Sequence, residues 1–263
     1  MYSKEHLEYL KKEKKNTLTI ITSQILIFIT FIIIWELLSK LEIINTFLYS
    51  SPSKIITTII KLINNKELFK HINITLCEVF ISFSLSTILG ILIATLLWFN
   101  KRLSLIIDPY ITIINSLPKV ALGPLIIIWV GASINSIIFM ALLISLFTTI
   151  INVYSGFNSI DKDYIIMFKS FKATKYQIFR YLILPSSIDN IISTLKINIS
   201  LNLIGVIMGE LLVSKEGLGY LIMYGSQVFN LDLVLTSIFI LGIISYLMYF
   251  IIDKFIAKKK KIF

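Results

Sequence analysis

The chain of 263 residues has few of the residue types that form disulfides and metal sites. It contains one cysteine, Cys77, and two histidines, His6 and His71. A single cysteine excludes an internal disulfide framework and any metal site built from several cysteines. The two histidines lie far apart near polar flanks, where ordinary surface or interface roles are the simpler interpretation. We therefore expect no metal site in this chain.

The sequence also lacks the motifs of nucleotide binding and hydrolysis. It has no G-x-x-x-x-G-K-[ST] motif, so it cannot cradle ATP phosphates by itself. It has no H-E-x-x-H motif, and a Ser/His/Asp triad would need one of the two histidines, which both lie outside the apolar segments. A membrane enzyme is thus poorly supported, and we expect no catalytic residues.

Charged residues are scarce as well. They make up 15% of the chain, whereas soluble domains carry about 25%, and 56% of the residues are hydrophobic. With a mean hydropathy of +0.86, this composition indicates an integral membrane protein. A net charge of +10 can also accompany a nucleic-acid partner. In a membrane protein the simpler explanation is topology, because basic residues collect on the cytoplasmic side, and we expect no nucleic acid.

The chain does have six apolar segments long enough to cross a membrane, which takes about 20 mostly apolar residues. They are Leu18–Leu38, Ile74–Trp98, Leu103–Val130, Ile137–Tyr154, Ile191–Val213 and Leu233–Ile252. The third is interrupted by Pro109, Pro118 and Pro124. All six are interpreted as helices, since an open strand cannot satisfy its backbone in lipid. The predicted fold is all-α, a polytopic membrane bundle of about six helices forming one domain, residues 1–263.

The distribution of lysine and arginine predicts the orientation. Most of them fall in four segments that lie on one side of the membrane, 1–17, 99–102, 155–190 and 253–263. The bias places both termini in the cytoplasm, although five lysines lie between the first two spans. Residues 18–73 then hold the first span and an external segment. Residues 74–252 hold the core spans with the cytoplasmic loop 155–190.

The basic tail, 253–263, contains four consecutive lysines, Lys258 to Lys261, that suit an anionic inner leaflet, so membrane lipid is an expected partner. The composition, rich in Ile, Lys and Asn, is typical of an AT-rich bacterial genome. We expect a bacterial plasma-membrane protein.

The external segment has its own helix signal. Ser51 is a candidate N-cap and Pro52 suits the first helical position. The isoleucines that follow share one helical face, at positions 55, 56, 59, 60 and 63. We expect a short helix that lies on the membrane surface or packs on the bundle.

Two of the predicted spans carry small residues at every fourth position. Such a stripe lets another helix pack closely. The alternative is that the spacing arises by chance in a chain rich in Ser and Ile. The stripe of the second span is Ser82, Ser86, Gly90 and Ala94, and that of the fifth is Gly205 and Gly209. We assign these residues to helix packing.

Polar residues also occur inside the spans. Asn198 and Asn202 are four residues apart on the fifth span, Glu210 lies near its outer end, and Lys119 follows Pro118 in the third. Such groups are costly in lipid and usually face the bundle interior or a water path. Two interpretations remain open: these residues line a substrate pathway, or they make helix–helix hydrogen bonds or snorkel.

The stretch FKSFKATKYQIFRYLILPSSIDN, residues 168–190, is basic and aromatic between two apolar runs. Thr174 and Gln177 form a capping-box pattern that predicts a helix start, and Pro185 predicts its stop. The passage is therefore a pair of short helices on the cytoplasmic side. It is either an amphipathic surface on anionic lipid or a docking site for a soluble partner.

This stretch, KATKYQIFRYLILP, resembles the cytoplasmic coupling loop of binding-protein-dependent ABC importer permeases, in the sulfonate/nitrate/taurine (MetI-like) family. Three further stretches resemble the same family in the same order. They are LYSSPSKIITTI, SLPKVALGPLIIIWVG and GELLVSKEGLGYLI, and with the loop they cover about residues 49 to 250.

The resemblance implies a permease that forms the substrate pathway and works as a homodimer. Two cytoplasmic ABC ATPase subunits and an external substrate-binding protein would complete the importer. ATP and magnesium would then be held by the ATPase, with no cofactor on this chain. The alternative is an ion-coupled secondary transporter or a channel, which needs no ATPase and should show inverted repeats with broken helices.

The resemblance also assigns a docking helix, Tyr164 to Thr174. The residues implied to contact the ATPase are Asp163, Tyr164, Met167, Phe168, Phe171, Lys172, Ala173 and Thr174. Lys172 stands where the family has Gly, and the family's Glu-Ala-Ala falls on residues 166–168, so Asp161 or Asp163 is the candidate replacement for the glutamate. Family members transport small anions such as sulfonates, taurine and nitrate, or pyrimidine vitamin precursors. Lys119 suits an anion.

Overall fold

The computed structural model describes the backbone of residues 4–260 and the side chains of residues 12–254, and every regular element in that range is helical. The first elements are α1 (Lys4–Lys40), α2 (Thr46–Tyr49), α3 (Pro52–Asn64), α4 (Glu67–Phe99) and α5 (Lys101–Ser116). A 3₁₀ turn η1 (Lys119–Leu122), α6 (Gly123–Val130), α7 (Ile134–Asn158) and α8 (Lys162–Ser170) follow. The last are α9 (Lys175–Ile178), the π-helical turn η2 (Phe179–Ile183), α10 (Leu184–Ser186), α11 (Ile188–Val213), α12 (Leu218–Gln227) and α13 (Leu231–Lys260). The all-α prediction is confirmed.

Five of the described helices are long and apolar enough to cross a membrane, and a sixth candidate is a bent pair. The pair is α5 with η1 and α6, whose two arms meet at 83°. Pro118 lies at the bend, whereas Pro109 is inside α5 and Pro124 begins α6. The predicted interruption of the third span is therefore confirmed, and Pro118 marks it.

Most helices extend beyond the predicted spans. Helix α4, for example, begins at Glu67, seven residues before the predicted start at Ile74. The predicted external segment therefore ends earlier than expected. Residues 67–73 include polar side chains that suit water better than lipid, so the apolar segment starts after them. The helix itself continues through them, because its backbone hydrogen bonds form in water as well.

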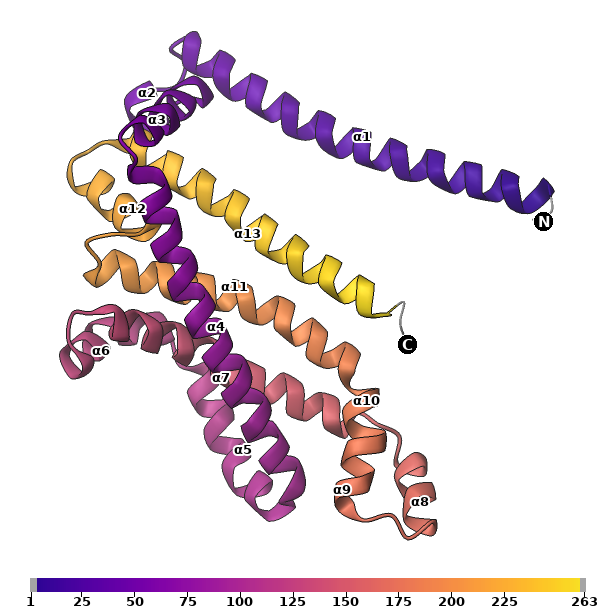
Figure 1. Ribbon diagram of the computed structural model, residues 1–263. Helices are drawn as coiled ribbons and strands as arrows, with labels where there is room; N and C mark the ends of the chain where they lie inside the picture. The colour runs from indigo at the N-terminus through magenta and orange to yellow at the C-terminus, as the bar shows by residue number, and fades with distance from the viewer. Residues whose placement is uncertain (1–3, 261–263) are drawn as a thin grey trace.

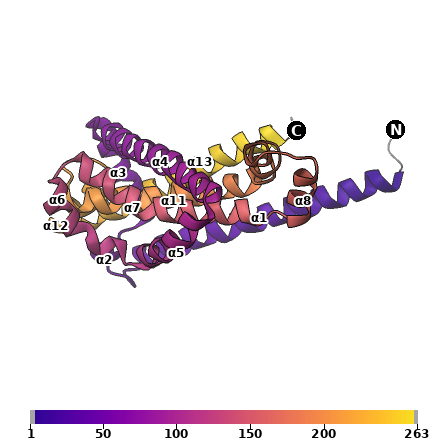
Figure 2. The same ribbon diagram turned by 90° about the horizontal axis from the view of Figure 1, so that it is seen from below.

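The central helices are α4, α7 and α11, which pack together, while α12 and α13 pack beside α11 (Figure 1). Both views place the chain ends and α8 toward the same end of the bundle, which we call the loop end (Figure 2). The opposite end carries α2, α3 and α12. Helix α1 touches α3 but otherwise stands apart, and its apolar window is fully exposed.

The predicted short helix is α3. The side chain of Ser51 accepts a hydrogen bond from the Lys54 backbone N–H, and Pro52 is the first residue of the helix, as expected. Ile55 and Leu62 are its buried positions, and Leu62 joins a cluster with Leu68 of α4 and the leucines of α12. The helix therefore packs on the bundle, while Ile56 and its turn neighbours remain exposed.

Close backbone packing occurs where the small residues lie. A Cβ atom added to Gly205 would lie 2.4 Å from Ala141 Cα, and one added to Gly209 would lie 2.8 Å from Ile137 Cα. The predicted stripe of α4 is fully buried, and a Cβ at Gly90 would lie 2.6 Å from the Thr149 side chain. The stripe residues Ser82, Ser86 and Ala94 are likewise 0% exposed. These positions leave room for no larger side chain.

Candidate functional site: a loop groove and a buried polar core

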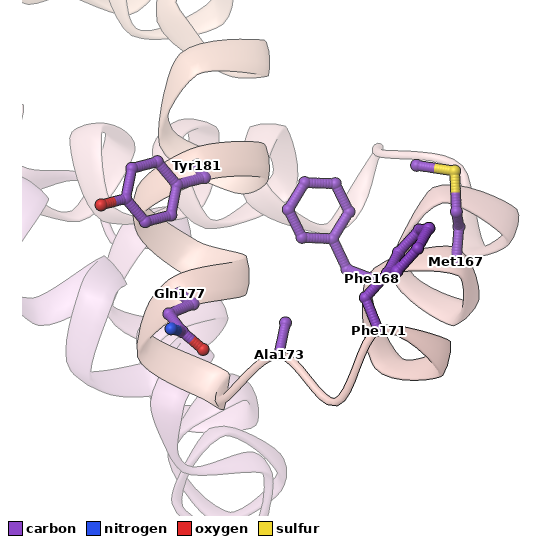
Figure 3. A pocket seen from close by; sticks show the side chains of 6 residues that line it. All are labelled: Met167, Phe168, Phe171, Ala173, Gln177 and Tyr181. Atoms are coloured by element: carbon purple, nitrogen blue, oxygen red, sulfur yellow. The ribbon is translucent and has the colours of Figure 1, made fainter.

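The loop end carries an apolar groove of about 440 Å³ between α8 and the helix that starts with α9. It is lined by Met167, Phe168, Phe171, Ala173, Gln177 and Tyr181. Figure 3 shows Phe168 pointing from the α8 side toward the helix that bears Gln177 and Tyr181, with Ala173 in the turn between them. Phe171 is 79% exposed and Tyr181 63%, so the groove presents large aromatic side chains to the surroundings. Such exposed aromatic groups are typical of protein contact sites.

Helix α8 is shorter than the docking helix predicted from Tyr164 to Thr174. It begins at Lys162 after the N-cap Asp161, whose carboxylate accepts the backbone N–H of Asp163 at 3.0 Å, and it ends at Ser170. The predicted boundary was wrong because the helix stops at a left-handed residue, Lys172, with φ of 58°.

The turn after α8 has the hydrogen bonds of a Schellman cap. The Lys172 N–H donates to Lys169 O at 2.8 Å and the Ala173 N–H donates to Phe168 O at 3.1 Å. Ala173 and Phe168 also pack on the same apolar cluster, as the residues flanking such a cap commonly do. Lys172 thus occupies a position that favours glycine, and Thr174 then caps α9 through the predicted capping box with Gln177.

The helix after the cap ends at Ser186, one residue past the predicted stop at Pro185, after running through η2 and α10. The π turn before Pro185 was not predicted. In it the Leu184 N–H donates to Phe179 O, five residues back.

The loop is anchored on the bundle beneath the groove. Phe179, Leu182 and Ile183 pack with Ala94 of α4 and with Val153 of α7. Lys175 Nζ donates to Phe99 O at the end of α4, and it lies 5.6 Å from the Trp98 ring. A force on the groove therefore acts directly on the ends of α4 and α7.

Asn198 and Asn202 are buried where α4, α7 and α11 meet. Asn198 Nδ2 donates to Thr87 Oγ1 at 2.8 Å and to Ser86 Oγ at 3.2 Å. Asn202 Nδ2 donates to Ser86 Oγ at 3.1 Å, and its Oδ1 accepts from Ser145 Oγ at 3.2 Å. Both asparagines are at most 1% exposed, so their polar atoms bond helix to helix. This geometry favours the helix-packing interpretation for the pair in the conformation described.

Glu210 is also fully buried, close to the end opposite the loop. Its carboxylate accepts the Thr75 hydroxyl at 2.6 Å and the Gly219 N–H at 2.5 Å. A Cβ atom at Gly217, where φ is 108°, would lie 2.3 Å from the same carboxylate. Glu210 therefore ties α4 and the start of α12 to α11, with the buried carboxyl of Glu78 beside it.

Lys119 is half-buried at the bend between α5 and α6. Its ammonium donates to Asn115 Oδ1 at 2.8 Å and to Ile144 O at 3.2 Å. It also lies 5.9 Å from the Phe147 ring. The charge is thus held by α5 and α7, and a pathway role for this residue stays a prediction.

Comparison with known proteins decides the family. Residues 86–261 match the family described as binding-protein-dependent transport system inner membrane component. The chain belongs to this family. It is an importer permease with several membrane-spanning helices, as the sequence resemblance indicates.

This permease is similar to curated transporters over most of its length. It is 32% identical to the formylaminopyrimidine transport permease protein ThiX of Halalkalibacterium halodurans, over 87% of this chain and 91% of that one. It is 28% identical to the putative aliphatic sulfonates transport permease protein SsuC of Bacillus subtilis, over 82% and 78%.

The fold of this permease also matches a solved one. The inward-facing MetNI methionine ABC transporter superposes with a TM-score of 0.62 at 21% identity, covering 70% of this chain and 92% of that one.

Sequence reasoning missed several residues of these two sites. Glu78 is a charged residue inside the predicted second span, and that alone could have marked it as a partner for Glu210. Gln177 and Tyr181 complete the groove, but they were assigned only to the second helix of the loop. Tyr181 lines the groove from the helix that contains the π turn, a turn that the sequence does not predict. Among the described residues, no group of three or more His, Cys, Asp or Glu is placed to hold a metal.

Proposed function

We propose that this permease forms the membrane pathway of an ABC importer and docks a cytoplasmic ATPase in the groove between α8 and α9. The family works with binding proteins, as its description states. The chain itself would supply no catalytic group, since ATP and magnesium would be bound by the ATPase. The permease would work as a homodimer with two ATPase subunits and an external binding protein.

The observation that carries this proposal is the groove with its exposed Phe171. Large aromatic anchors in apolar pockets supply most of the energy at protein contacts. The groove also rests on the ends of α4 and α7 through Phe179 and Lys175. Closure of an ATPase dimer against the groove would therefore move two central helices directly.

The proposed orientation places the loop end in the cytoplasm. The basic residues of segments 99–102 and 155–190 fall toward that end, as does the C-terminal end of α13, and the positive-inside bias then assigns it. Both termini would be cytoplasmic in a bacterial plasma membrane. The exposed apolar window of α1 would face lipid or the second copy of the chain.

Replacing Phe171 by aspartate tests the docking site. The full chain is purified through a tag from its own cells, and the co-purifying ATPase is measured. The loss of a central aromatic anchor should reduce the bound ATPase by about tenfold or more, since hot-spot truncations cost about 2 kcal/mol or more. Phe171 is exposed, so the fold should survive the change.

Phe229→Asp is the matched control, because Phe229 is 72% exposed and lies two residues after α12, which is at the opposite end of the bundle. That variant and Phe171→Leu should both retain the ATPase. Undiminished ATPase on Phe171→Asp would show that docking occurs elsewhere.

The transported solute is a small anion or an amino-bearing pyrimidine in this proposal. The relative named for aliphatic sulfonates supports the anion, and the relative named for formylaminopyrimidine supports the pyrimidine. The alternative of an ion-coupled transporter has no support in these relatives.

A further inference from the structure

A second pocket lies in the loop-end half of the bundle, between α4, α5 and α7. Its volume is about 300 Å³. Its polar lining comprises Ser104, Asp108, Thr112, Tyr154, Ser155 and Asn158. All of these are neutral except Asp108, so one carboxylate sets the charge of the pocket.

The carboxylate of Asp108 is unpaired. Within residues 12–254 the structure gives it neither a hydrogen bond nor an ion pair. Ser104 and Tyr154, by contrast, bond to each other through their hydroxyls. The basic residues of the same helix, Lys101 and Arg102, lie seven and six positions earlier, about 9–10 Å along its axis. The negative charge is therefore free to act on a solute.

Asp108 lies at the exposed edge of the face by which α5 packs on the bundle. Ser104, four residues before Asp108, and Ile111 are the buried positions of the helix, whereas Asp108 and Thr112 are exposed. An unpaired carboxylate facing lipid is strongly disfavoured, and charged groups in spans usually face a water-filled path. This edge is therefore best explained as the wall of such a path.

No basic side chain lines the pocket. Lys119, the candidate for attracting anions, has its ammonium bonded to Asn115 and to Ile144 O. About 4 Å from the free carboxylate, the binding constant of a singly charged cation rises by about fivefold in water-like surroundings, and that of an anion falls by as much. The effect is larger in surroundings with a protein-like dielectric constant. The pocket thus repels anions and attracts cations and N–H donors.

We propose that Asp108 is a specificity-determining residue, and that its pocket is a transit site for amino-bearing or cationic solutes that disfavours small anions. This inference rests on the proposed permease function and deepens it, because it separates the two solute classes left open above. An amino group can donate to the Asp108 carboxylate while the hydroxyls of Thr112 and Ser155 bond its other polar atoms.

Thiol labelling tests charge selection in the pocket without a known substrate. The single cysteine, which is exposed, is first removed by Cys77→Ser, and Thr112→Cys then places a thiol one turn from Asp108. The full chain with its co-purified ATPase is placed in lipid nanodiscs. It is labelled with 2-(trimethylammonium)ethyl methanethiosulfonate, which is cationic, or with 2-sulfonatoethyl methanethiosulfonate, which is anionic.

The ratio of the two labelling rates is the readout. Asp108→Asn, which keeps the size and removes the charge, should lower the cation-to-anion ratio by about fivefold or more. Asp108→Glu should keep the ratio, which excludes a merely structural effect. An unchanged ratio in Asp108→Asn, or a thiol that neither reagent reaches, would overturn the inference. ATPase co-purification in the same sample reports on the proposed function independently.

Discussion

Replacing Lys172 by glycine should tighten the loop that separates α8 from α9. Lys172 has φ of 58° in the Schellman cap, a conformation that costs a residue with a side chain about 1–2 kcal/mol. Glycine adopts it without that cost, but it loses about 0.4–1 kcal/mol through the greater freedom of the unfolded chain. The net gain in local stability is therefore about 0.5–1 kcal/mol.

Hydrogen–deuterium exchange measures this gain at the amides that close the cap. These are the Lys172 and Ala173 N–H groups, bonded to Lys169 O and Phe168 O. Every 1.4 kcal/mol corresponds to a tenfold change in an equilibrium constant, so exchange in this peptide should slow about two- to fivefold. Peptides of α7, outside the loop, should be unchanged.

Lys172→Ala separates the backbone effect from the loss of charge. It removes the ammonium but keeps a Cβ atom, so the left-handed conformation remains strained and exchange should not slow. Equal slowing in the alanine and glycine variants would show that the lysine charge, and not the backbone angle, sets loop stability. Faster exchange in the glycine variant would refute the strain argument altogether.

Two further substitutions test the buried contacts. Gly205→Ala should lower the thermal stability of the purified chain by about 1–3 kcal/mol, since its Cβ would lie 2.4 Å from Ala141 Cα. Gly242→Ala should not lower the stability, because a Cβ atom at Gly242 would have nothing within 4 Å. Equal melting temperatures of the two variants would contradict the close packing at Gly205. Asn202→Leu should cost about 1–2 kcal/mol, as interhelical bonds in membranes are each worth about 0.6 kcal/mol. An unchanged melting temperature would show that the asparagine network adds no stability.

The helices could be predicted because apolar length and proline position are local properties of the sequence. The break at Pro118 and the caps at Ser51 and Thr174 follow from single residues, and the structure has all three. The helix ends at Ser186, one residue past the predicted stop at Pro185, but the π turn before it was not predicted. Phe179 and Leu182 of that turn pack against the bundle, which is a tertiary contact that no local pattern contains.

The site was only partly predictable, since function depends on which side chains meet across helices. Glu210 was recognised as a costly charge, but its partner Thr75 lies 135 residues away in the sequence, and its contact with the Gly219 N–H depends on how the chain turns between α11 and α12. Lys119 was assigned to a pathway by its charge alone. Its bonds to Asn115 and to a carbonyl of α7 are tertiary contacts that no local pattern contains.

The distribution of paired and free charge separates the parts of the bundle that hold the fold from those that can act on a solute. Hydrogen bonds to neighbouring helices hold Asn198, Asn202 and Glu210, so moving these residues would break contacts between α4, α7 and α11. Asp108 makes no such bond, and its helix contacts the bundle along one face only. A permease must keep its central helices together while one wall of its path remains free to meet a solute. The unpaired carboxylate on α5 meets that requirement in our proposal, whereas Asn198, Asn202 and Glu210 are held by bonds between helices in the conformation described.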